Sequence, residues 1–278
     1  LFMRYSRQEL VIGKKAQRIL SRSKVAVVGL GALGTVAAEL IARAGIGIKL
    51  IDRDIIEHTN LQRQSLFDES DINKSKALIS KKKLKKINSA IQIESYFTHL
   101  DYENINIIKS DIILDCTDNL ETRYLLNEYA VKENIPLIYA AAIKDKGYVF
   151  NIVKKPCLKC ILKKAKTTET CETEGVLNTI TTIVAAIQVN EAIKILTKQP
   201  QEKELLYING KENNITKIKV KQDPNCSVCN GEFEYLSGKK TKLHTYCGGY
   251  VFKEPFSYEQ VKKRFKKIGA LDMQKVLC

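Results

Sequence analysis

Short apolar runs alternate with longer helix-like stretches through the first half of the chain. Runs of this length predict strands where they are apolar throughout or where apolar and polar residues alternate. Four of them lie at residues 25–28, 48–52, 91–95 and 112–114. The helix-like stretches lie at residues 3–20, 32–44, 74–87 and 120–133. Because strands that alternate with helices form parallel sheets covered on both faces, this half predicts an α/β fold.

The pattern changes after Gly147. Before this point, one more strand of the alternating half is predicted at residues 136–142. After it, strands are predicted at residues 148–153, 205–209 and 215–220, and helices at residues 179–196 and 258–267. The turn residues 210–214 make the last two strands an antiparallel pair. Residues 165–175 are polar and rich in threonine, which indicates a loop. The chain therefore predicts a mixed sheet, parallel first and antiparallel later.

Composition narrows the class of protein. The chain has 278 residues, of which 44% are hydrophobic, as in ordinary soluble globular proteins. It contains no apolar run near the roughly 20 residues that span a bilayer. Charged residues at Arg4, Arg7 and Glu9 interrupt any signal-peptide core at the start. We therefore expect a soluble cytoplasmic protein that does not contact a membrane.

The charge balance is strongly basic, with a formal net charge of +15. Such a charge suits a nucleic acid, an acidic protein partner or a polyphosphate substrate, and it does not choose among them. The lysine run at residues 81–86 ends a predicted helix, where the helix dipole favours cations. A solvated helix face is therefore its simplest interpretation.

The stretch Lys24 to Asp52 carries the clearest chemical signal. A strand leads into Gly29-Leu30-Gly31-Ala32-Leu33-Gly34, a helix follows, and a second strand ends at an acid. This order is that of a nucleotide-binding βαβ unit. The backbone can approach phosphate oxygens at the helix N-terminus because of Gly29, Gly31 and Gly34. Asp52 is placed to accept hydrogen bonds from ribose hydroxyls. The unit alone serves ATP and NAD equally well.

Charged residues outside this unit suit a triphosphate. Arg63 lies in Asn-Leu-Gln-Arg-Gln at residues 60–64, and Lys76 stands near the start of a helix. Asp118 follows the carboxyl end of a strand, where open α/β sheets bind ligands, and a carboxylate there can hold Mg²⁺. Each residue alone is more typical of a surface charge. Together they favour bound ATP.

Two Cys-x-x-Cys pairs, Cys157/Cys160 and Cys226/Cys229, predict a zinc site. Four thiolates complete a tetrahedral Zn²⁺ shell, so the site is closed and structural.

The predicted fold class is thus α/β, a Rossmann-like, mostly parallel mixed sheet with helices on both faces, plus a zinc-pinned antiparallel portion. Residues 1–231 are predicted to form this domain, and residues 232–278 a small extension.

The other cysteines are less informative. Cys171 lies in the polar loop close to several lysines, so it is either a nucleophile with a lowered pKa or an incidental thiol. Cys116 stands at a strand end and is expected to be buried. Cys247 lies in the extension, and no role is predicted for it.

Taken together, these residues resemble the ThiF/MoeB/HesA family, relatives of ubiquitin-activating enzymes. The resemblance covers roughly residues 3–231 and rests on motifs that occur in order. They are residues 4–8 and 29–34, Asp52, residues 60–64, Lys76, residues 115–119, Cys157/Cys160, Cys171 and Cys226/Cys229. The sequence departs from the pattern at Ala32, where some members have glycine, and a methyl group there is expected to be tolerated.

The resemblance implies adenylation of the C-terminal glycine of a ubiquitin-like sulfur-carrier protein that ends in Gly-Gly. The implied cofactors are ATP, Mg²⁺ and Zn²⁺. The implied ATP site comprises Gly31, Asp52, Asn60, Arg63, Lys76, Asp118 and Asn119. Arg7 resembles the arginine that reaches into the partner subunit of a homodimer, and Cys171 stands where members place a catalytic or sulfur-transfer cysteine. A separate protein is expected to donate the sulfur.

Three other functions compete with this one. An NAD-dependent oxidoreductase accounts for the glycine turn and Asp52 but leaves Arg63 and Lys76 unexplained. A zinc-stapled nucleic-acid-binding protein accounts for the charge, but few aromatic residues lie near the basic runs to stack on bases. A tRNA-adenosine dehydratase of the same superfamily also begins with adenylation. Nucleic acid is therefore not the expected partner, and the pathway of the carrier stays open.

Overall fold

The computed structural model describes residues 4–162, 174–240, 245–246 and 249–250. The chain forms two compact units, Leu1–Gly238 and Lys239–Cys278. In the second unit, β9 (Thr245–Tyr246) pairs with β10 (Gly249–Tyr250) as antiparallel strands. The helix predicted at residues 258–267 and Cys247 lie outside the described residues.

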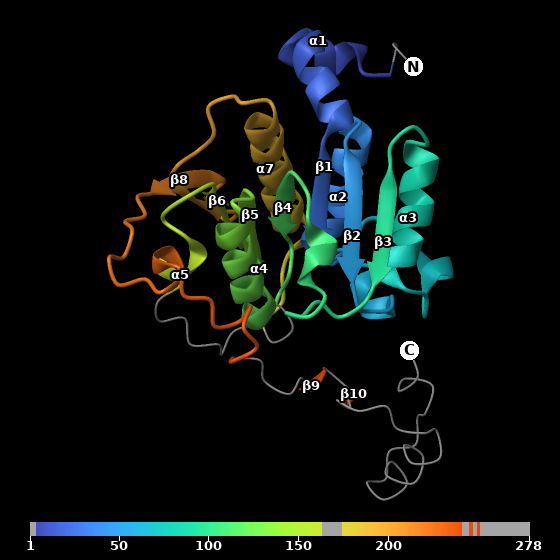
Figure 1. Ribbon diagram of the computed structural model, residues 1–278. Coiled ribbons are helices and arrows are strands. Elements are labelled where there is room, and N and C mark those ends of the chain that lie inside the picture. Colours follow the sequence, from blue (N-terminus) through green and yellow to red (C-terminus); the bar gives the residue numbers. More distant parts are fainter. Residues whose placement is uncertain (1–3, 163–173, 241–244, 247–248, 251–278) are drawn as a thin grey trace, which may run out of the picture. The chain divides into compact units, whose positions relative to one another are not determined.

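The first unit is built on one eight-stranded sheet (Figure 1). Its strand order is β3-β2-β1-β4-β5-β6-β7-β8. The strands are β1 (Lys24–Val28), β2 (Gly47–Asp52), β3 (Ile93–Phe97), β4 (Ile112–Asp115), β5 (Leu137–Ile143), β6 (Lys146–Ile152), β7 (Leu205–Asn209) and β8 (Asn214–Ile218). The first five strands in this order, β3, β2, β1, β4 and β5, run parallel to one another. The pairings β5–β6, β6–β7 and β7–β8 are antiparallel. The predicted mixed, mostly parallel sheet is confirmed.

Helices cover both faces of the sheet. The helices are α1 (Ser6–Arg22), α2 (Ala32–Ala44), α3 (Lys76–Ile87), α4 (Leu120–Glu133), α5 (Leu158–Ile161) and α7 (Asn178–Leu196). Short 3₁₀ turns are η1 (His58–Asn60), η2 (Glu69–Asp71), η3 (Ile105–Ile108) and η4 (Val228–Asn230). Helices α2, α3 and α7 bury one apolar cluster against the sheet, and α4 with η3 buries a second cluster on the opposite face.

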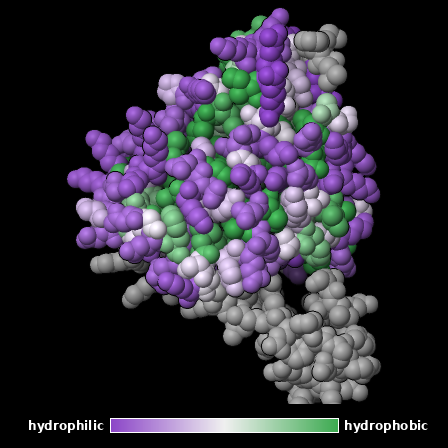
Figure 2. All heavy atoms as spheres, viewed as in Figure 1, coloured by the Kyte–Doolittle hydropathy of each residue, from purple (hydrophilic) through white to green (hydrophobic). Residues whose placement is uncertain are grey.

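The central strand β1 shows how the sequence produces these two layers. Val25 and Val27 belong to the first apolar cluster, whereas Ala26 and Val28 belong to the second. Successive side chains of a strand point to opposite faces, so an uninterrupted apolar run is buried on both. The surface outside these layers is mostly hydrophilic on the side that Figure 2 shows.

Helix α7 is a core helix of this fold. It is long and apolar enough to cross a membrane by length and composition alone. Its buried side chains Ile180, Val184 and Val189 pack into the apolar cluster of the sheet. Its apolar character is therefore explained by packing within the protein.

Helix α1 lies at the edge of the sheet where the strands begin. The sequence predicted one continuous helix, but Gly13 interrupts it with φ +83°, a conformation that glycine adopts without strain. The Gln8 amide donates to the carbonyl of Ala44, just before β2, and Gln17 donates to the same oxygen. The first turns of α1 are therefore fixed at the amino ends of the strands.

Candidate functional site

The order of the parallel strands reverses between β1 and β4, and their carboxyl ends form the usual ligand crevice of such a sheet. The glycine turn after β1 lies in this crevice. A Cβ on Gly34 would lie 1.8 Å from the Gly29 oxygen, and one on Gly29 would lie 2.7 Å from the Cys116 oxygen. A Cβ on Gly31 would meet only the Gln64 Nε2, at 4.0 Å. Protein packing thus explains Gly29 and Gly34, while Gly31 is free to let a ligand approach.

This difference makes a prediction. We expect Gly34→Ala to lower the midpoint of thermal unfolding, because overpacking of this kind typically costs about 1–3 kcal/mol. Gly31→Ala should unfold at the wild-type temperature but bind ATP about tenfold more weakly or worse, because the methyl group stands where phosphate approaches. Thermal unfolding and calorimetric ATP titration of both variants measure this. Wild-type ATP affinity in Gly31→Ala would contradict the assignment of the glycine turn to the nucleotide site.

Asp52 is the acid at the tip of β2, and it ties the glycine turn in place. Its carboxylate accepts the Leu30 N–H at 2.6 Å and the Asp54 N–H at 2.7 Å. Burial raises the pKa of Asp52 to about 6, against the opposing charge of Lys76. Lys76 thus favours the ionised carboxylate, whose remaining lone pairs can accept further hydrogen bonds. Its role toward a ribose stays a prediction.

Lys76 begins α3 and belongs to the same charged group. Ser75 caps this helix by accepting the Leu78 N–H. The Lys76 side chain is buried, its Nζ lies 3.4 Å from the Asp54 carboxylate, and its charge lowers the pKa of Asp52. A buried ammonium beside two carboxylates is held in one place, which suits the neutralisation of a phosphate.

The five-residue motif 60–64 turns past this group. The buried Asn60 accepts the Glu57 N–H through its Oδ1, and the Arg63 guanidinium donates to the Thr59 carbonyl at 2.8 Å. Gln64 is buried, and its amide is the nearest group to the open side of Gly31. Sequence reasoning did not select Gln64 as a site residue, although its place beside Arg63 in the motif was an available signal.

The loop after β4 carries the other predicted residues. The fully buried Asp115 accepts the N–H and the hydroxyl of Thr117, at 3.0 and 2.7 Å, and shapes the start of this loop. Asn119 accepts the Thr122 N–H at 2.8 Å and caps α4, a structural role that the sequence prediction did not include. Asp118 is exposed. Its carboxylate is thus accessible to a cation.

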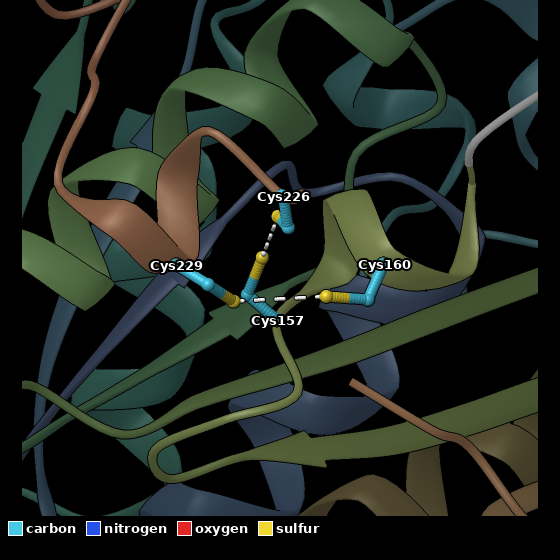
Figure 3. A group of neighbouring side chains, drawn as sticks. All are labelled: Cys157, Cys160, Cys226 and Cys229. Carbon is cyan, nitrogen blue, oxygen red and sulfur yellow. Dashed lines mark hydrogen bonds between the residues drawn. The ribbon is translucent and has the colours of Figure 1, made fainter. Parts of the chain in front are cut away.

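The four predicted metal ligands are brought together, as Figure 3 shows. All four cysteines are buried, and their sulfur atoms lie within 4.8 Å of one another. The sulfurs of Cys157 and Cys226 are 3.6 Å apart, as are those of Cys160 and Cys229. Zn–S bonds of about 2.3 Å in a tetrahedron imply sulfurs about 3.8 Å apart, so the donor set fits such an ion.

Neighbouring contacts fix this cluster against α4. The Leu158 N–H donates to Asn127 at 2.8 Å. The buried Glu128 carboxylate accepts three successive N–H groups, those of Glu234, Tyr235 and Leu236. Residues 232–238, which the sequence assigned to the extension, thereby pack within the first compact unit. Four buried thiols form a closed ligand set, which is typical of a structural metal site.

The structure does not bring the side chains of the other predicted residues, Cys116, Cys171 and Arg7, into this crevice among the residues that it describes. Cys116 is buried, and its thiol donates to Gln188; burial raises its pKa, which makes it a poor nucleophile. Cys171 lies outside the described residues. Arg7 lies in α1 at the amino edge of the sheet, so one chain does not bring it to the Gly31 turn.

Comparisons with known proteins agree with this geometry. The ThiF family model matches residues 5–228. The chain is 38% identical to the sulfur carrier protein ThiS adenylyltransferase of Bacillus subtilis, over 88% of this chain and 77% of the relative. It is 35% identical to the Escherichia coli protein of the same name, over 83% of this chain and 96% of the relative.

A solved structure shows the same fold. It is the crystal structure of E. coli MccB with ATP, which matches with a TM-score of 0.71 and 28% identity. The match covers 81% of this chain and 73% of that one. The family model spans the nucleotide crevice, the pair Cys157/Cys160 and Cys226, and it ends at Val228, one residue before Cys229. The chain belongs to the ThiF family.

Proposed function

We propose that this protein adenylates the C-terminal glycine of a ubiquitin-like sulfur-carrier protein of the ThiS or MoaD type, at the expense of ATP. The observation that carries the proposal is the buried Lys76 beside Asp52 in the crevice of the glycine turn. Hydride transfer adds no negative charge to the phosphates of a nicotinamide cofactor, whereas attack on the α-phosphorus of ATP does, and a buried cation suits that developing charge. Named relatives that match most of the chain are ThiS adenylyltransferases.

In the proposed reaction, a carboxylate oxygen of the carrier's terminal glycine attacks the α-phosphorus of ATP. The bond breaks between the α-phosphorus and the oxygen that joins it to the β-phosphorus, which gives an acyl-adenylate and pyrophosphate. The protein's task is to place the groups and to offset negative charge. Lys76 and Arg63 offset that charge, and the accessible Asp118 would hold Mg²⁺, which would supply further positive charge to the phosphates.

A second copy of the chain is part of the proposal. Arg7 lies at the amino edge of its own sheet, away from the carboxyl-edge crevice. Leu10 and Val11 on the same helix are 78% and 85% exposed. A homodimer that covers this helix would bury both side chains and would carry Arg7 to the partner's crevice.

Further parts of the proposal concern metal and sulfur. Zn²⁺ in the Cys157/Cys160/Cys226/Cys229 cluster would pin residues 226–229 to α5 and take no part in the reaction. The activated carrier would then receive sulfur from a separate donor, with Cys171 as the candidate transfer thiol. All of these steps are expected in the cytoplasm.

The alternatives explain less. An NAD-dependent oxidoreductase leaves Lys76 and Arg63 without a role, and a nucleic-acid-binding protein needs no nucleotide crevice. A tRNA-adenosine dehydratase shares the adenylation step, but the named relatives act on sulfur carriers. Calorimetry with ATP, NAD and a short RNA duplex separates an ATP-dependent enzyme from an NAD-dependent oxidoreductase and from a nucleic-acid-binding protein, and we expect Mg²⁺-dependent binding of ATP alone.

The test is ATP–pyrophosphate exchange with a purified carrier that ends in Gly-Gly. We expect exchange that needs the carrier and Mg²⁺, and that Arg63→Ala reduces strongly. Exchange at the wild-type rate in Arg63→Ala would contradict the assignment of Arg63.

A further inference from the structure

Arg53 follows Asp52 directly at the tip of β2, and its side chain is held on two sides. Its Nη1 donates to the Nδ1 of His99 at 3.2 Å, and its Nε lies 3.7 Å from the Asp54 carboxylate. Arginine has no acceptor, so His99 must accept through an unprotonated Nδ1. The side chain of Arg53 is 30% exposed. The guanidinium is therefore held by His99 and Asp54 and is still accessible to a ligand.

The contacts place this guanidinium on the β3 side of Asp52. His99 follows β3, the neighbour of β2, and the Thr98 N–H donates to the Asp52 carbonyl at 3.2 Å. The backbone N–H of Asp54 donates to the Asp52 carboxylate, and the Asp54 carboxylate contacts the Lys76 ammonium. Asp54 thus contacts both cations that lie near Asp52, namely Lys76 and Arg53.

Charge accounts for Lys76 but leaves Arg53 without a task in the chemical step. In βαβ nucleotide sites, the acid at the end of the second strand binds ribose hydroxyls, and in NADP sites an arginine nearby accommodates the 2′-phosphate. An arginine next to this acid is therefore within reach of the 2′ position. A guanidinium that is already held by two partners loses little further freedom when it binds a ligand, so the contact would discriminate well.

We propose that Arg53 is a specificity residue of the nucleotide site, which donates a hydrogen bond to the ribose 2′-hydroxyl beside Asp52 and so selects ATP over 2′-deoxy-ATP. The inference rests on the proposed function for the presence of an ATP site. It adds a residue that touches the ribose and leaves the attack on the α-phosphorus to Lys76 and Arg63.

The test compares ATP with 2′-deoxy-ATP by calorimetry, with the full chain and without any carrier. We expect wild type to prefer ATP and Arg53→Ala to reduce that preference at least about tenfold, through weaker ATP binding, because a hydrogen bond to a charged group is lost. Binding of 2′-deoxy-ATP should stay unchanged, which also shows that the site is folded. Arg43→Ala, an exposed arginine paired with Glu39 on α2, is the matched control and should behave as wild type.

Equal weakening of both nucleotides in Arg53→Ala, or no change in either, would overturn the inference. Arg53→Lys provides a second test if the alanine variant does not fold. Lysine keeps the charge but lacks the planar fork that His99 and Asp54 hold, so we expect the same loss of preference. If wild type binds neither nucleotide, the proposed ATP site itself fails, which is distinct from a failure at Arg53.

Discussion

Replacing Lys76 by alanine is expected to lower the rate of ATP–pyrophosphate exchange by about 10²–10³-fold, the usual effect of losing one preorganised charge at a transition state. The Lys76 ammonium is buried and lies 3.4 Å from Asp54. Its loss would also leave Asp52 and Asp54 without their nearest opposing charge. The pKa of Asp52, already raised to about 6, would rise further.

Lys82 on the same helix is the matched control because it is exposed. Lys82→Ala changes the net charge by the same amount and should exchange at the wild-type rate. Steady-state exchange at saturating ATP measures the effect, with thermal unfolding to confirm that both variants are folded. A Lys76→Ala variant within about threefold of wild type would remove Lys76 from the proposed transition state.

Replacing Cys160 by serine is expected to release the metal and to lower the midpoint of thermal unfolding by about 10 °C. A structural zinc site is worth several kcal/mol, and each kcal/mol shifts the midpoint of a domain of this size by about 2–4 °C. The loss would free residues 226–229 from α5. Elemental analysis should find a zinc ion in wild type and none in the variant.

Cys116→Ala separates this effect from the loss of any buried thiol. Cys116 is also buried, but its partner is Gln188 and it lies outside the cluster. The variant should keep its zinc. Wild-type zinc content and unfolding midpoint in Cys160→Ser would show that the four sulfurs do not form a metal site.

Sequence patterns predicted most of the fold because its core elements are locally unambiguous. The run Val25–Val28 can be buried on both faces only as a central strand, and β1 has that position. The two Cys-x-x-Cys pairs lie far apart in sequence, yet thiol chemistry alone predicted that they meet. These features are determined by composition over a few residues.

What the sequence did not provide depends on distant contacts. Asn119 was expected only at the nucleotide, but its Oδ1 caps α4. Arg7 was expected to reach into the site of a partner subunit, and the bonds from Gln8 and Gln17 to Ala44 show that α1 lies at the amino edge of its own sheet. The orientation of Arg53 depends on His99, which follows another strand. No local pattern contains such partners.

The central claim is that the crevice activates a carrier protein with ATP. The most direct measurement is ATP–pyrophosphate exchange with two forms of one ThiS-type carrier, the intact protein and a form that lacks its last glycine. We predict Mg²⁺-dependent exchange with the intact carrier and none with the shortened form. Equal exchange with both forms, or no exchange with any carrier that ends in Gly-Gly, would contradict the claim.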